Sequence, residues 1–112
     1  MEKVYVVCYD IISSEDHYSN HDEQEIIVCK DLKTGLKKFR EKCLDGIEWY
    51  KSYYNDYKND EDYEMYDTPS GLKKEISEKI KNNDYVFCIS FNNPCDEYEW
   101  TCEVVLKELE VL

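Results

Sequence analysis

Two histidines with neighbouring acids are the first residues whose spacing could serve chemistry. His17 and His21 stand four positions apart beside Asp16 and Asp22, and imidazole and carboxylate groups are common zinc ligands. Histidines at this spacing share one face of a helix, but the polar segment from Ser13 to Glu23 is typical of a loop. We therefore expect a solvated turn here and no metal site.

The six cysteines are the other reactive side chains. Four of them lie in strand-like apolar runs, as buried thiols do, and no two form a Cys-x-x-Cys pair. Cys95 follows Pro94 in a turn, but the negative charges of Asp96 and Glu97 disfavour the thiolate that a catalytic cysteine needs. We expect all six to be reduced, without a cofactor, as in a cytosolic protein: Cys8, Cys29, Cys43, Cys88, Cys95 and Cys102.

Other catalytic patterns are missing from the sequence. A hydrolase needs two carboxylates with separated pKa values in one cleft, and nothing singles out such a pair among the 26 acids. A phosphate-binding loop is rich in glycine, and the chain has only Gly35, Gly46 and Gly71. The sequence predicts a protein that is not an enzyme, and a small metal- or thiol-dependent enzyme is the alternative.

The stretch from Asp45 to Asp67 combines many acids with many aromatic rings. It holds eight acids, Trp49 and six tyrosines, against only Lys51 and Lys58. Tyr and Trp provide rigid contact area with a polar tip, and carboxylates attract a basic partner. We therefore expect a partner-binding surface, to which the acids after Pro94 also contribute: Trp49, Tyr53, Asp56, Asp60, Glu61, Asp62, Tyr63, Glu64, Tyr66, Asp67, Asp96 and Glu97.

The charge of the whole chain favours a basic partner as well. Its 112 residues give a net charge of −12, which nucleic-acid phosphates and anionic membranes would repel. No apolar run approaches a transmembrane length, and the start Met1-Glu2-Lys3 lacks the features of a signal peptide. We expect a single domain over residues 1–112 in the cytoplasm.

Four strands are predicted from β-branched and aromatic runs at 4–12, 25–29, 85–91 and 98–106. The first two are expected to pair through a long loop. In the last strand the alternation ends at Leu109 and Val111, so a bulge is expected near Val105 or Leu106. Strands at both ends of the chain predict an α+β domain, an antiparallel four-stranded sheet of order β-β-α-α-β-β with two helices packed on one face. Its edges leave monomer or dimer undecided.

Two helices are predicted between the strand pairs. The first has Thr34 as its N-cap and an apolar stripe at Leu36, Phe39, Cys43, Ile47, Tyr50, Tyr54 and Tyr57. Gly46 falls inside it, which predicts a kink or a close contact. Trp49 and Tyr53 lie off the stripe and are expected to be partly exposed. After a loop or frayed end over 59–67, a second helix is capped by Thr68 or Ser70 and buries Leu72, Ile76 and Ile80.

A small acidic chain with interleaved tyrosines resembles phage-encoded inhibitors that imitate DNA, including anti-CRISPR proteins that block Cas nucleases. The resemblance is carried by Asp56, Tyr57, Asp60, Glu61, Asp62, Tyr63, Glu64, Tyr66 and Asp67, with Asp96, Glu97, Glu99 and Glu103 as additional candidates.

The resemblance implies that carboxylates stand in for phosphates and compete for the arginines of a DNA-binding channel. The implied partner is a basic effector, a Cas nuclease or its guide-RNA complex. The basic block Lys30–Lys42 departs from a uniform mimic and could contact guide RNA or an acidic patch of the effector. The alternative is an acidic interaction module, such as an immunity protein that neutralises a basic toxin.

Overall fold

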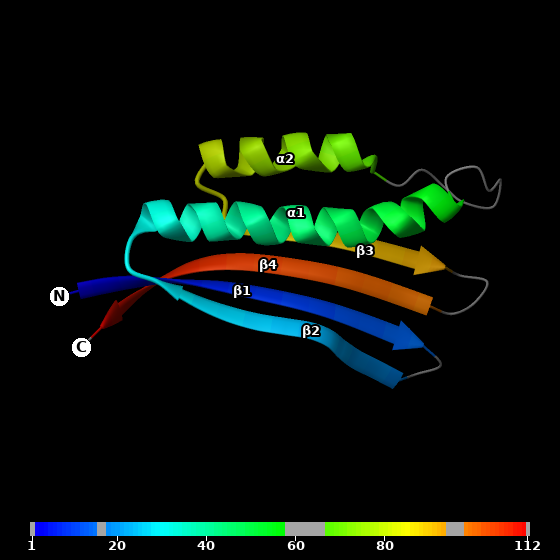
Figure 1. The fold of residues 1–112 in the computed structure, drawn as a ribbon, viewed down its shortest axis with the longest axis horizontal. Helices are drawn as coiled ribbons and strands as arrows, with labels where there is room; N and C mark the ends of the chain where they lie inside the picture. The colour runs from blue at the N-terminus through cyan, green and yellow to red at the C-terminus, as the bar shows by residue number, and fades with distance from the viewer. Residues whose placement is uncertain (1, 16–17, 58–66, 94–97, 112) are drawn as a thin grey trace.

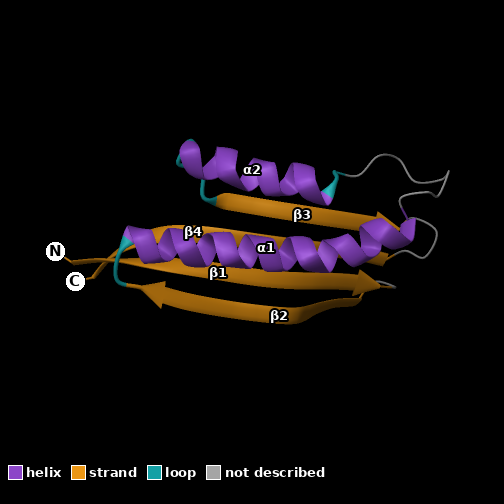
Figure 2. Cartoon of the chain, turned by 45° about the horizontal axis from the view of Figure 1, so that its top comes forward, coloured by secondary structure: helices purple, strands orange, loops and turns teal. Residues whose placement is uncertain are grey.

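Four antiparallel strands form one sheet, and two helices lie on one of its faces (Figure 1 and Figure 2). This computed structural model describes residues 2–15, 18–57, 67–93 and 98–111, except for the side chains of residues 15, 18–21, 57 and 93. The elements are β1 (Glu2–Glu15), β2 (Tyr18–Cys29), α1 (Leu32–Tyr57), α2 (Pro69–Lys81), β3 (Val86–Asn93) and β4 (Tyr98–Val111). The predicted α+β class, element order and antiparallel sheet are confirmed.

The two longest strands lie in the centre of the sheet, whose order is β2-β1-β4-β3. β1 and β4 pair along their whole length, from Glu2 opposite Val111 to Glu15 opposite Tyr98. Side chains alternate across such a sheet, so the odd positions of β1 and the even positions of β4 face the helices. This alternation separates a helix-covered face from an open face.

The prediction of a long loop between the first two strands is wrong. β1 and β2 stay paired as far as Glu15 opposite Tyr18, so most of segment 13–23 is strand. Most of the segment's described residues belong to the edge strand β2, and an antiparallel sheet can leave one face in water, so few apolar residues are needed here. Polar composition alone therefore did not distinguish this edge strand from a loop.

The bulge predicted near Val105 or Leu106 is also wrong. Across the described residues, the pairing of β4 with β1 and β3 runs without a register shift. The apolar side chains at the end of β4 simply lie on the open face. The irregularity falls in β2, where Asp22 is an extra residue opposite the step from Ile11 to Ile12.

α1 is capped by Asp31 and not, as predicted, by Thr34. The Asp31 Oδ1 atom accepts a hydrogen bond from the backbone N–H of Thr34 at 2.7 Å. This bond lowers the pKa of the Asp31 carboxyl group. The helix therefore begins at Leu32, because Asp31 satisfies one of the N–H groups that a helix start leaves without a partner.

The stripe predicted for α1 packs on the sheet. Its described members are buried or half-buried: Leu36, Phe39, Cys43, Ile47, Tyr50 and Tyr54. Gly46 marks the closest approach, since a Cβ atom there would lie 2.5 Å from the Cys102 Sγ atom. Of the two explanations predicted for Gly46, the close contact is confirmed.

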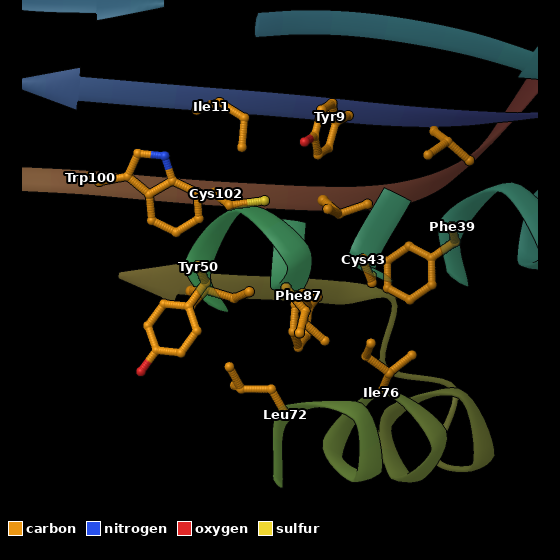
Figure 3. Close-up of a cluster of buried hydrophobic side chains, with 14 of the residues drawn as sticks. Tyr9, Ile11, Phe39, Cys43, Tyr50, Leu72, Ile76, Phe87, Trp100 and Cys102 are labelled. Atoms are coloured by element: carbon orange, nitrogen blue, oxygen red, sulfur yellow. The ribbon is translucent and has the colours of Figure 1, made fainter. Parts of the chain in front are cut away.

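α2 begins at the predicted cap and closes the core beside α1. The Thr68 Oγ1 atom accepts a hydrogen bond from the backbone N–H of Gly71 at 3.1 Å. Leu72 and Ile76 are buried and point toward Phe87 of β3 (Figure 3). The helix ends at Lys81, followed by Asn83 in the left-handed conformation (φ 57°) that asparagine tolerates.

Candidate partner-binding end

The fold brings three acidic stretches of the chain to one end of the sheet. Asp10 of β1 lies opposite Glu103 of β4, and near this level Gly46 of α1 lies against Cys102. Beyond this level the strands continue toward both hairpin ends while α1 continues toward its C-terminus (Figure 1). We name the described residues among 10–24, 45–67 and 88–103 the distal half, and all other described residues the proximal half.

Charge is divided unevenly between these halves. Among the described side chains, the proximal half carries nine carboxylates and twelve basic groups, a net charge of +3. The distal half carries nine carboxylates and only Lys51, a net charge of −8: Asp10, Asp22, Glu23, Asp45, Glu48, Asp56, Asp67, Glu99 and Glu103. Among the described side chains, the excess acid is therefore gathered at one end.

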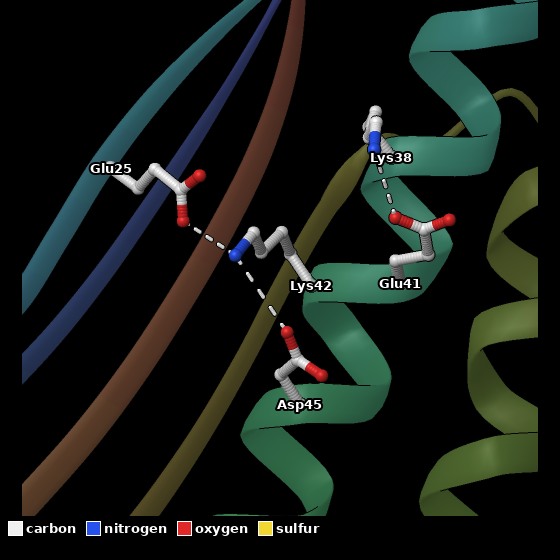
Figure 4. Close-up of polar contacts among 5 residues, drawn as sticks. All are labelled: Glu25, Lys38, Glu41, Lys42 and Asp45. Atoms are coloured by element: carbon white, nitrogen blue, oxygen red, sulfur yellow. Dashed lines mark hydrogen bonds and ion pairs between the residues drawn. The ribbon is translucent and has the colours of Figure 1, made fainter.

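Every ion pair found between described side chains uses a proximal lysine. Lys42 lies 2.5 Å from Glu25 and 3.7 Å from Asp45, and Lys38 lies 3.3 Å from Glu41 (Figure 4). The others join Lys3 to Glu108 and Lys79 to Asp84. Within the described ranges, the carboxylates of Glu48, Asp56 and Glu99 have no basic side chain at ion-pair distance. Their charge is therefore available to a partner.

Aromatic contacts hold the distal part of α1 against β3 and β4. Tyr53 of α1 stacks on Phe91 of β3, with ring centroids 4.8 Å apart and an interplanar angle of 18°. Its hydroxyl oxygen lies 2.9 Å from that of Tyr98. Trp49 packs against the buried Trp100 with a centroid distance of 6.2 Å. These contacts fix the C-terminal half of α1 against the start of β4.

Four of the twelve predicted site residues lie in the described part of the chain. Asp56 and Asp67 are exposed, and the Asp67 carbonyl oxygen accepts a 2.7 Å hydrogen bond from the Tyr50 hydroxyl group. Trp49 and Tyr53 are half-buried, in agreement with the partial exposure expected of them. Their ring contacts with the core show that they also hold the fold together, which leaves less of each ring for a partner.

The other eight predicted site residues lie outside the described residues: Asp60, Glu61, Asp62, Tyr63, Glu64, Tyr66, Asp96 and Glu97. The same holds for Cys95 and His17, while His21 belongs to β2 and its side chain is not described.

The fold adds acids that the predicted site omitted. Glu48 and Glu99 are exposed in the distal half, and so is Glu103 in β4. Glu99 and Glu103 entered the sequence interpretation only through the resemblance to DNA mimics. Glu48 could have been found from its position on α1, because it lies off the buried stripe and one residue before Trp49.

The described thiols show no sign of activation. Cys29, Cys43 and Cys102 are buried, Cys8 is half-buried and Cys88 is exposed, and none of these five forms a disulfide. Burial raises the pKa of Cys102 to about 12 and also raises that of Cys43. The pKa of Cys88 is raised by partial desolvation and then by the charge of Glu103. Thiolate chemistry is disfavoured at all three.

Metal ligands do not gather among the described residues, where no three His, Cys, Asp or Glu side chains are grouped closely enough to hold an ion. No helix in the described ranges has the length and apolar character to cross a membrane. Comparisons of the chain with protein-family models, with curated proteins and with solved structures found no match.

Proposed function

We propose that this chain is a non-enzymatic inhibitor that binds a basic nucleic-acid-binding protein through its acidic distal half. In this proposal the carboxylates take the place of DNA phosphates, and a CRISPR nuclease is the first effector to test. The observation that carries the proposal is the division of charge, −8 in the distal half against +3 in the proximal half among described side chains.

Glu48, Asp56 and Glu99 suit a phosphate-like role because they are exposed and, within the described ranges, have no basic side chain at ion-pair distance. A carboxylate already paired to lysine would have to break that pair before it met a new arginine. Glu48, Asp56 and Glu99 have no such pair among the described residues, so an arginine can approach them directly. Their attraction would also accelerate encounter with a basic channel.

Rigid support is the second element of the proposal. Binding costs less when the interacting groups are ordered beforehand. Tyr53 is held by Phe91 and Tyr98, and this contact anchors the part of α1 that carries Asp56. The aromatic rings thus serve the proposed surface by positioning its acids, with only their exposed edges left to touch a partner.

The test measures binding to a purified Cas9–guide RNA complex by gel shift and DNA competition. Binding should weaken steeply between about 50 and about 200 mM salt, because screening suppresses attraction between surface charges. The distal triple variant Glu48→Gln, Asp56→Asn, Glu99→Gln should lower the affinity at least about tenfold.

The matched control removes three carboxylates from the proximal half, in the variant Glu75→Gln, Glu78→Gln, Glu110→Gln. Both variants change the net charge equally, so a general charge effect would weaken binding equally. No complex at low salt would refute the nuclease as the partner, and equal losses would refute the distal half as the binding surface.

A further inference from the structure

The sheet face that the helices leave open carries an apolar strip. The row Ile26–Cys8–Val105–Val86 crosses all four strands, because these residues pair successively from β2 to β3. Five large apolar side chains on this face are exposed: Ile26 (66%), Val28 (66%), Val86 (49%), Leu109 (49%) and Val111 (44%). Apolar side chains gathered on one exposed face commonly mark an interaction site.

The paired strands give this face the area of a small interface. β1 and β4 pair over 14 levels, β1 and β2 over 11, and β4 and β3 over 8, with β3 beginning in the row at Val86. With strands about 4.8 Å apart and levels about 3.4 Å apart, these pairings cover roughly 540 Å². A standard protein interface buries about 800 Å² on each partner, so a weak association is expected.

We propose that this face forms a homodimer, in which two copies pack sheet against sheet about a two-fold axis that runs along the row Ile26–Cys8–Val105–Val86. Rotation about this axis reverses the strand direction, so β4 of one copy lies over β4 of the other with its ends exchanged. The row then packs on its own counterpart and buries the exposed side chains of Ile26 and Val86. The inference does not rest on the proposed function, but the same rotation brings Val111 of one copy over Glu99 of the other, so the dimer and the effector would compete for Glu99.

The charges of β4 beside the row match this arrangement, while Asp10 of β1, at the level of Glu103, comes to lie over Val6 of the other copy. Lys107 and Glu103 share the open face with Val105 and stand two residues on either side of it. The two-fold rotation exchanges these positions, so Lys107 faces the partner's Glu103, and Glu103 faces the partner's Lys107. Each lies about 7 Å from the axis, and a crossing angle of about 30° between packed sheets displaces it by only about 4 Å. Long side chains can span that displacement.

The charges of the described side chains favour the same orientation. Because the rotation reverses the strands, the distal half of one copy lies over the proximal half of the other. The described charges then place −8 over +3 at each end, and the two acidic ends point in opposite directions. A parallel stack would instead place the two acidic ends together, where they would repel each other.

Sedimentation equilibrium of the full chain at concentrations from about 1 to about 100 µM tests the proposal, since micromolar dissociation constants fall in this range. The wild type should form a dimer. Lys107→Glu should raise the dissociation constant at least about tenfold by placing two carboxylates opposite each other, and Glu103→Lys should do the same with two ammonium groups. The double variant should recover the affinity of the wild type.

Lys74→Glu on α2 is the matched control, because it makes the same charge change on the helix side of the molecule and should leave the dimer intact. Circular dichroism checks that each variant is folded, and recovery in the double variant excludes general damage. A wild type that remains monomeric at about 100 µM would overturn the proposal and leave the face to a different partner. A dimer that neither single reversal weakens would overturn the proposed geometry.

Discussion

The hydroxyl oxygens of Tyr53 in α1 and Tyr98 in β4 lie 2.9 Å apart, which joins the distal part of the helix to the sheet by a side-chain hydrogen bond. The two residues are 45 positions apart in sequence. The ring of Tyr53 also stacks on Phe91, so the hydrogen bond closes a contact that already has aromatic support.

Removing one of these hydroxyl groups should cost about 1 kcal/mol of unfolding free energy, the usual net value of a hydrogen bond. Tyr53→Phe keeps the ring stacking and tests the hydroxyl group alone. Because each single change breaks the same hydrogen bond, the double variant Tyr53→Phe, Tyr98→Phe should lose less unfolding free energy than the sum of the two single losses, as measured by urea unfolding. Additive losses would contradict the coupling.

Gly46→Ala should destabilise the protein although alanine is the better helix former. Alanine gains up to about 1 kcal/mol of helix propensity, but its Cβ atom would meet the Cys102 Sγ atom at 2.5 Å, and such overpacking costs about 1–3 kcal/mol. Asn55→Ala, at an exposed position of the same helix, should be neutral or stabilising in the same thermal unfolding measurement. Equal stability of Gly46→Ala and wild type would show that α1 can shift away from the sheet.

Thr68→Ala should cost about 1 kcal/mol of unfolding free energy, because the Thr68 Oγ1 atom caps α2. Ser70→Ala is the matched control. Its hydroxyl group lies 3.5 Å from that of Thr68 and does not cap the helix, so its removal should have a much smaller effect. Equal losses in chemical unfolding would argue against Thr68 as the cap.

Lys42 should make the free energy of unfolding depend on pH in the alkaline range. Its pKa is raised first by the hydrogen bond to Glu25, and its ammonium group lies 5.1 Å from the centre of the Tyr9 ring. Because the folded-state pKa lies above the unfolded one, this stabilisation is present below about pH 10.4 and is lost as the pH rises through the folded pKa. Lys42→Met keeps most of the apolar stem and should lower stability by about 1 kcal/mol at pH 7.

The pH profile separates the charge of Lys42 from its packing. In urea unfolding, the difference between wild type and Lys42→Met should shrink once the pH exceeds the folded pKa. A difference that stays constant through this range would assign the effect to packing alone.

Local patterns predicted the elements of this fold, and contacts distant in sequence account for the errors. The stripe of α1 and the alternation of β4 depend on spacings of three or four and of two, which are visible in the sequence. The role of Asp31 as a cap was missed because Thr34 also precedes the apolar stripe, and the two differ only in which one reaches a free N–H group. The polar edge strand β2 resembles a loop until its pairing with β1 is known.

The candidate site was only partly predictable for a related reason. Acidic blocks are visible in the sequence, but their meeting at one end requires the antiparallel order β2-β1-β4-β3. Trp49 and Tyr53 were correctly placed off the buried stripe. The periodicity of α1 gives no information about Phe91 of β3 and Trp100 of β4, which contact these two rings.

The uneven charge of the two halves makes each molecule an electric dipole. Near a positively charged surface such a dipole experiences a torque, so the molecule turns its acidic end forward before contact. A larger fraction of collisions would then begin in a productive orientation than for an evenly charged chain of the same net charge. Two copies stacked with their ends reversed would cancel this dipole, so dielectric relaxation would distinguish the monomer from the dimer.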